Sequence, residues 1–134
     1  MIDDLALTEK DLIDNLLDNL PAGYAQSQVK MPNMKFTTPT NSKWLRITFN
    51  TGLKQNVEAG GSYKRIFGIL TIDCFYPKGS GTKAQLADIK LIQNLYENQQ
   101  IGNAKCFEAE ANIIGEDDSW YNVQVNINYY YEGA

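Results

Sequence analysis

The stretch Phe67-Gly-Ile-Leu-Thr-Ile-Asp-Cys-Phe-Tyr-Pro77, followed by Lys-Gly-Ser-Gly81, decides the fold. Its apolar and β-branched residues predict a long strand from about Tyr63 to Tyr76, which the Pro and Gly-rich turn ends. A helical pattern opens at Thr82 directly after the turn. A long strand that runs through a tight turn into a helix is typical of a domain that combines helices and strands.

Both faces of this strand are apolar, and such strands are usually covered on both sides. One face carries Ile66, Leu70, Ile72 and Cys74, and the other carries Phe67, Ile69 and Phe75. A small domain with one long helix beside its sheet can hardly cover both faces, so a neighbouring subunit is a candidate for the second cover. Asp73 is the single charge between Ile66 and Tyr76. We interpret it as an inter-strand or interface hydrogen-bond acceptor, because the sequence offers it no catalytic partners.

Two helices are predicted from apolar periodicity. The first begins at Thr8, whose hydroxyl caps it, and Pro21 ends it. Its apolar stripe is expected to dock on the domain's own sheet rather than on a partner. The second runs from Thr82 to Asn98, with Thr82 or Ser80 as its cap. Its expected apolar face contains Ala84, Ala87, Ile89, Leu91, Ile92, Leu95 and Tyr96, and its expected polar face contains Lys83, Gln85, Lys90, Gln93 and Asn94.

Three further strands are predicted from alternation. They are Trp44 to Phe49, Asn103 to Ile114 and the segment from Tyr121 to Tyr131. In the second of these, Phe107, Ala109, Ala111 and Ile113 are expected to face the core, and Cys106, Glu108, Glu110 and Asn112 to face away. The last strand turns Asn122, Gln124, Asn126 and Asn128 to one side. An uncharged amide face of this kind suits water, a partner sheet or a lumen, and a solvated face is the default.

The connections are also informative. Residues 22–42 are predicted to be an extended arm, because so long a connection without a period is uncommon inside a compact domain. Thr51 to Ser62 is predicted to be a turn or hairpin loop of mixed charge, and Gly115 to Asp118 a sharp turn. The chain of 134 residues is expected to be one α+β domain. Its small mixed, mainly antiparallel sheet is expected to have about four to five strands, with two principal helices packed on one face.

The composition argues against most kinds of catalytic, metal-binding and nucleotide-binding site. The chain contains no histidine, which excludes Ser-His and Cys-His nucleophiles and removes the commonest metal ligand. Carboxylate groups occur at Asp3-Asp4, at Glu108 with Glu110, and at Glu116 to Asp118, and we interpret them as solvated charges. Gly79-Ser-Gly81 lacks the spacing and the Lys-Ser or Lys-Thr ending of a nucleotide loop. We therefore predict no enzyme activity, no cofactor and no metal site.

The net charge of −4 gives no broad basic footprint for gripping nucleic acid. The amino-terminal residues lack the basic and apolar regions of a secretory signal, and no apolar run is long enough to cross a membrane. We therefore expect a protein that is made in the cytoplasm and has no membrane partner. Cys74 and Cys106 have no closely spaced partner of the zinc-site kind, so both are expected to be reduced cysteines in the core or the sheet.

The order of these pieces resembles one family over nearly the whole chain. A short helix and a long polar connection precede the strand Trp44-Leu-Arg-Ile-Thr-Phe49. A Gly-rich loop then leads to Arg65 to Leu70, Phe75-Tyr-Pro77, Gly79-x-Gly81 and a helix through Ala87-Asp-Ile89. Trp120-Tyr-Asn-Val-Gln-Val-Asn-Ile127 closes the pattern. In this order and spacing the chain is similar to the tail terminator-like proteins of long-tailed bacteriophages.

The resemblance implies a non-enzymatic structural protein of the virion. Several copies, usually about six, are expected to form a ring on the head-proximal end of the tail tube, where the ring stops tube polymerisation. The implied partners are other copies of the chain, the tube protein and a neck or head-completion protein, and DNA is only cargo passing through the lumen. The contact residues that we predict are Met31, Met34, Phe36, Lys54, Glu58, Lys64, Arg65, Asp117, Asp118 and Trp120, because they are exposed by pattern and mix aromatic groups with charges.

Three other hypotheses remain at the level of sequence. A neck or tail-completion adaptor would occupy a neighbouring station in the same virion. A ferredoxin-like binding module would receive a small ligand or peptide on its amide face, beside Trp44, Trp120 and Tyr130. A small acid-base enzyme built on Asp73 and Glu108 is the weakest, because it needs a cleft that holds both carboxylates.

Overall fold

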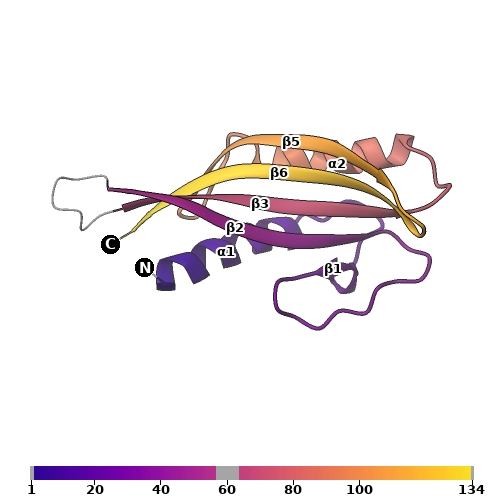
Figure 1. The fold of residues 1–134 in the computed structure, drawn as a ribbon, viewed down its shortest axis with the longest axis horizontal. Coiled ribbons are helices and arrows are strands. Elements are labelled where there is room, and N and C mark those ends of the chain that lie inside the picture. Colours follow the sequence, from indigo (N-terminus) through magenta and orange to yellow (C-terminus); the bar gives the residue numbers. More distant parts are fainter. Residues whose placement is uncertain (1, 57–63, 134) are drawn as a thin grey trace.

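The computed structural model describes residues 2–56 and 64–133, with side chains for residues 4–52 and 64–133. In chain order its elements are α1 (Ile2–Leu17), the 3-10 turn η1 (Gln26–Gln28), β1 (Val29–Lys30), β2 (Trp44–Asn56), β3 (Lys64–Pro77), α2 (Lys83–Tyr96), β4 (Gln100–Ile101), β5 (Ala104–Glu116) and β6 (Trp120–Gly133). The four long strands lie side by side along the length of the molecule (Figure 1).

The strands of the described residues form one six-stranded sheet in the order β1-β2-β3-β6-β5-β4. Every pairing is antiparallel except that of β1 with β2. The α+β class and the mixed, mainly antiparallel sheet are therefore confirmed. The sheet has more strands than predicted because β1 and β4 contain two residues each. Strands this short cannot be recognised from the alternation of apolar and polar residues.

Both helices pack on the same face of the sheet, as predicted. Leu12 and Leu16 of α1 and Ile89 and Ile92 of α2 belong to one buried cluster with the sheet. The sheet contributes to this cluster Leu45 and Ile47 from β2, Ile66, Leu70, Ile72 and Cys74 from β3, and Val123, Val125, Ile127, Tyr129 and Tyr131 from β6. The hydroxyl of Tyr96 donates to the carbonyl of Leu12 over 2.6 Å and so ties the two helices together. Cys74 and Cys106 are free and buried, as expected.

The first helix begins earlier than predicted. Thr8 is not its cap, because α1 already starts at Ile2 and Thr8 is completely buried within it. Asp4 in the first turn suits the positive end of the helix dipole. The stripe through Leu12 and Leu16 docks on the chain's own sheet, as predicted.

The second helix turns a different face to the sheet. Its buried residues are Gln85, Ile89, Ile92 and Tyr96, whereas Ala84, Ala87 and Leu91 are exposed. The helical period predicts that Gln85 and Gln93 face water, and burying an amide is costly without a partner. Here the partners exist, since Gln85 donates to the Ser80 hydroxyl over 3.0 Å and Gln93 donates to the Ala109 carbonyl over 2.8 Å.

The inward and outward positions predicted for β5 are partly wrong because the strand contains a β-bulge. Cys106 pairs with Tyr129 and Ala109 pairs with Ile127, so three steps on β5 match two on β6. The extra residue reverses the alternation. Cys106 and Ala109 are both buried, while Phe107 turns to the opposite face, where its ring lies 5.4 Å from that of Tyr130. Ala111 and Ile113 lie on the helix side of the sheet but are exposed.

The arm and the loop also differ from expectation. Residues 22–42 begin with η1 and β1, and β1 pairs with Leu45 and Arg46 of the same chain. β2 continues to Asn56, so the predicted loop from Thr51 is strand over its first residues. Glu58 lies outside the described residues, and of Lys54 only the backbone is described. Within residues 2–56 and 64–133, neither helix has the length and apolarity needed to span a membrane.

Candidate interaction face

The face of the sheet opposite the helices has no helix over it among the described residues. The strand register places side chains of three long strands on it. They are Trp44, Arg46, Thr48 and Asn50 of β2, Phe67, Ile69, Thr71, Asp73 and Phe75 of β3, and Asn122, Gln124, Asn126, Asn128 and Tyr130 of β6. We call this surface the open face. It has a polar centre between two aromatic ends.

The polar centre is a continuous hydrogen-bond network. Asp73, only 2% exposed, accepts at one oxygen from Arg46 over 3.0 Å and at the other from Gln124 over 3.0 Å. Asn126 donates to Gln124 over 3.1 Å and accepts from the Thr71 hydroxyl over 2.8 Å. The predicted inter-strand acceptor role of Asp73 is confirmed, and the network joins β2, β3 and β6.

One aromatic end is built around Trp44. Its ring stacks on Phe75 at 4.1 Å between centroids, contacts Phe36 of the arm at 5.3 Å and meets Trp120 edge-on at 6.0 Å. The Arg46 guanidinium lies 5.1 Å from the Phe75 ring, a cation–π distance. Trp44 is 7% exposed as a result. The cluster therefore holds part of the arm and the start of β6 against the chain's own sheet.

The other aromatic end stays open to solvent. Ile69 and Phe107 are each 38% exposed, and the ring of Tyr130 contacts those of both Phe67 and Phe107. A hollow of about 310 Å³ lies here, lined by Asn50, Gly52, Phe67, Gly68, Ile69, Phe107, Asn128 and Tyr129. The Arg65 guanidinium lies 4.6 Å from the Tyr130 ring and pairs with Glu132 at 2.7 Å. This end offers a partner an apolar surface with an ion pair beside it.

The hairpin tip between β5 and β6 is held by Asp117. Its carboxylate accepts from the backbone amides of Ser119 and Trp120, each over 2.8 Å. These hydrogen bonds favour the charged form and lower the pKa of Asp117 below its ordinary value. Asp117 and Asp118 themselves are exposed. The tip therefore presents an ordered pair of acidic residues to solvent.

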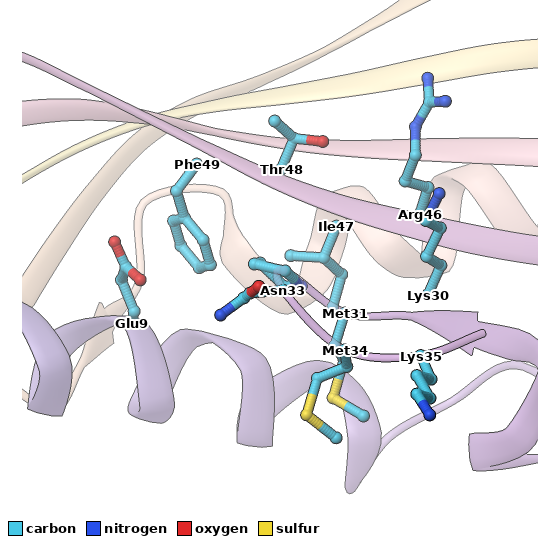
Figure 2. A pocket seen from close by; sticks show the side chains of 11 residues that line it. Glu9, Lys30, Met31, Asn33, Met34, Lys35, Arg46, Ile47, Thr48 and Phe49 are labelled. Carbon is cyan, nitrogen blue, oxygen red and sulfur yellow. The ribbon is translucent and has the colours of Figure 1, made fainter.

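A groove of about 690 Å³ lies at the outer edge of β2, between α1 and the arm (Figure 2). Figure 2 shows Glu9 of α1 at one end of the groove and Arg46 with Lys30 at the other, with Met31 and Met34 between them. Lys35 also lines it, so three cations and one acid surround an apolar floor. Met34 is 60% exposed, while Met31 packs partly against the core.

The comparisons with known proteins decide the family. The model of the phage tail terminator protein family matches residues 10–129 of the chain. The chain belongs to this family. One solved structure is similar to this tail terminator protein at a TM-score of 0.65 and 18% sequence identity, covering 93% of this chain and 96% of the other. At that identity the likeness establishes the fold alone. Among curated proteins, none matches the sequence.

Membership makes this tail terminator protein a structural component of a phage tail, and thus of the virion, that interacts with other tail components. The contact residues predicted from the sequence whose side chains are described fall in four places of the fold, one of which is the tip with Asp117 and Asp118. Phe36 and Trp120 meet around Trp44, and Met31 and Met34 line the groove. Lys64 and Arg65 lie at the opposite end of the sheet, where they pair in register with Gly133 and Glu132. The structure therefore does not gather them into one patch.

Several exposed apolar residues of the tail terminator protein were not singled out from the sequence. Phe107 was placed in the core, and only the bulge puts it on the open face. Leu86, Ile113 and Ile114 are also exposed. The doublet Ile113-Ile114 just before the turn at Gly115 was the available indication, because two adjacent apolar residues break the alternation and cannot both face one core.

The two carboxylates of the enzyme hypothesis do not converge. Asp73 lies on β3 with both oxygens occupied, whereas Glu108 is exposed in the bulge of β5, and β6 separates the two strands. A group of three or more metal-ligating side chains does not occur among the residues that the structure describes. This tail terminator protein instead presents three surface features: an open sheet face, a groove and an acidic tip.

Proposed function

We propose that this tail terminator protein caps the head-proximal end of the tail tube as a ring, ending tube polymerisation and forming the joint to the neck. The family match over residues 10–129 carries this proposal. The geometry supports it, because an open sheet face with exposed Ile69 and Phe107 is suited to covering by another protein chain. Copies that contact each other head to tail form a ring when the rotations between successive copies add up to one full turn.

The proposed joint to the neck would let DNA pass without binding it. The chain carries a net charge of −4, and the middle of the open face is made of amides, a threonine and one compensated ion pair. With the apolar end at Ile69 and Phe107 covered by another protein chain, this polar middle is left to line the lumen, and it lacks the unpaired cations that bind phosphate. DNA is therefore cargo in this proposal, and the protein partners are further copies, the tube protein and a neck protein. No catalytic role is included.

The test is tube length. Tube protein from the same phage would be polymerised in the presence of increasing amounts of this protein, and tube lengths measured by electron microscopy. A cap shortens the tubes at far less than one copy per tube subunit and leaves a ring at one end. Tubes of unchanged length and with bare ends would contradict the proposal. A ring that binds finished tubes without shortening growing ones would favour the neck or tail-completion adaptor.

The predicted contact residues remain part of this proposal. Arg65 and Trp120 lie at opposite ends of the sheet, so Arg65→Ala and Trp120→Ala probe two separate contacts. Each is expected to weaken ring formation while circular dichroism shows a folded chain. Asn94→Ala, an exposed change on α2 outside the open face, the groove and the tip, is the matched control. If both variants form rings as readily as this control, the two assignments are wrong.

One observation favours a second candidate, the small-ligand or peptide-binding module. The hollow at Phe67, Ile69 and Phe107 has apolar walls and two amide side chains, a composition found in ligand sites. This alternative predicts a monomer that binds apolar probes at the hollow. Competition between such a probe and ring formation would distinguish it, since a binding module has no ring to lose.

A further inference from the structure

Both outer edges of the sheet are largely unpaired. On one side, β1 covers β2 only at Leu45 and Arg46. β1 ends there because Pro32 has no backbone N–H to donate and Asn33, at a φ of 52°, turns the chain away. From Ile47 onward β2 pairs with β3 on its inner side and with no strand on its outer side within the described residues. Such an edge is a template for another strand.

The edge on the other side is also open, but only in its second half. β4 pairs with Ala104 and Lys105, and the backbone amide and carbonyl of Ala109 are bound by the side chains of Glu97 and Gln93 of α2. Because alternate residues of a strand point their backbone groups to the same side, those of Ala111 and Ile113 also point outward. Both residues are exposed, and Ile113 is 67% exposed.

The strand directions make the two edges compatible. β2 is antiparallel to β3, β3 to β6, and β6 to β5. β5 is therefore antiparallel to β2. A second copy in the same orientation, placed beside the first, would bring its β2 next to β5 as a regular antiparallel neighbour. The contact would be heterologous, joining one edge to the other edge rather than to itself, and such contacts generate rings.

The chemistry of the two edges is complementary. The groove along β2 carries Lys30, Lys35 and Arg46 around the apolar side chains of Met31 and Met34 (Figure 2), with Glu9 as its one acid. The edge of β5 carries acids around apolar side chains, namely Glu108, Glu110 and Glu116 with Ile113 and Ile114. The antiparallel sense places the acidic end of β5 at Glu116 beside Lys30 of β1, whose partner in register is Arg46 at the start of β2. Lys30 is exposed, whereas Arg46 is already paired with Asp73, so Lys30 is the main cation at this end. Opposite charges at the two edges favour pairing between edges over pairing of like edges.

We propose that the outer edge of β5, from Ala111 to Glu116, pairs with the outer edge of β2 of a second copy, in the groove between that copy's α1 and arm. This inference rests on the proposed ring and names the surfaces that build it. Because β1 already occupies the edge at Leu45 and Arg46, the incoming strand meets β2 from Ile47 onward. Neighbouring copies are thereby staggered along the strands, and closing a sheet into a barrel requires a stagger.

The first test removes one outward N–H. Proline is tolerated on the open side of an edge strand, so Ala111→Pro is expected to fold but to lose the pairing. Ala111→Ser, which keeps the N–H, is the matched control. Light scattering is expected to show wild-type oligomers for Ala111→Ser and a monomer for Ala111→Pro at the same concentration. Circular dichroism and the melting temperature of Ala111→Pro identify a failure to fold.

The second test reverses a charge without touching the backbone. Glu116→Lys places a cation beside Lys30 and Arg46 of the next copy, whereas its own 3.9 Å ion pair with Lys78 is exposed and contributes little. The midpoint of assembly is expected to move to at least about tenfold higher protein concentration. Asp18→Lys, the same charge change at an exposed position after α1, is expected to leave the midpoint unchanged.

The outcomes distinguish a failure of the proposed edge pairing from a failure of the proposed ring. If Ala111→Pro and Glu116→Lys both assemble like their controls, the edge pairing is wrong and the ring stands. If Ala111→Pro forms wild-type rings that no longer stop tube growth, the edge of β5 belongs to the tube protein, which also overturns the inference. A wild-type chain that stays monomeric at every concentration contradicts both the ring and this interface.

Discussion

Among single residues, Asp73 has the largest share in organising the open face. A carboxylate on an outer sheet face would ordinarily be solvated, yet this one is buried beneath Arg46 and Gln124 and receives hydrogen bonds from both. The sequence indicated its role because it is the one charge in the apolar run from Ile66 to Tyr76. The identity of its partners could not be read from the sequence, because they follow from a register that joins residues 27 and 51 positions away.

Removing this carboxylate should cost stability. Asp73→Ala leaves Gln124 and the guanidinium of Arg46 without their acceptor, and we expect a loss of about 1–3 kcal/mol in the free energy of unfolding. Urea denaturation followed by circular dichroism measures it. Thr48→Ala, an exposed change on the neighbouring strand, should stay within about 0.5 kcal/mol of the wild type. Equal midpoints and slopes for the two variants would show that the network does not stabilise the sheet.

The hairpin tip should respond to acid. Because backbone hydrogen bonds from Ser119 and Trp120 lower the pKa of Asp117 in the folded chain, its contribution to tip stability is complete above the ordinary pKa of 3.8. That contribution is lost as the pH falls through the lower, folded-state pKa. We expect the Asp117 carboxyl signal in NMR to titrate below 3.8 and the Ser119 and Trp120 amide signals to shift with it. A midpoint at or above 3.8 would contradict the hydrogen-bonded tip.

At the scale of elements, the bulge of β5 depends on α2. Gln93 and Glu97 bind the carbonyl and the amide of Ala109, the first residue after the extra position. These two side chains satisfy backbone groups that a neighbouring strand would otherwise satisfy. They therefore stop the pairing of β5 with β4 from extending and leave the edge from Ala111 onward open.

Loss of these side chains should loosen the bulge. The double variant Gln93→Ala/Glu97→Ala removes both hydrogen bonds, and we expect the Ala109 amide to exchange with solvent about tenfold faster or more, as the loss of about 1 kcal/mol per bond implies. Hydrogen exchange measured by NMR tests this. Asn94→Ala, an exposed change on the same helix, is the control. Unchanged protection of Ala109 in the double variant would mean that the bulge is fixed by the sheet alone.

The elements also show where sequence-based inference stops. β6 was predictable because its alternation is regular over many residues, and β3 because its apolar run is long. Only the first half of β2 was predicted, since the residues from Thr51 onward carry turn-forming and charged side chains yet continue the strand to Asn56. The bulge in β5 was not, since one extra residue reverses the inward and outward positions without changing composition. The face of α2 was also missed, because Gln85 is buried and Gln93 half-buried only by virtue of partners outside the helix.

At the scale of the whole molecule, the sequence predicted an uncovered sheet face but not the sheet's edges. The apolar positions on both faces of β3 indicated that one face needs cover from outside the chain, and the structure leaves Ile69 exposed there. Strand order is set by long-range pairing, which local patterns do not contain. Only the order β1-β2-β3-β6-β5-β4 reveals that β2 and β5, each covered by a two-residue strand, form most of the sheet's two edges, with a basic groove along β2 and acidic residues on β5.

Ring formation is tested by the mass of the wild-type protein in solution. Native mass spectrometry or light scattering would be carried out over a wide range of protein and salt concentrations. The account predicts a discrete species of about six copies of the 15.1 kDa chain, weakened by salt because charged edges contribute to it. A strict monomer at every concentration, or a dimer that does not grow further, would contradict it.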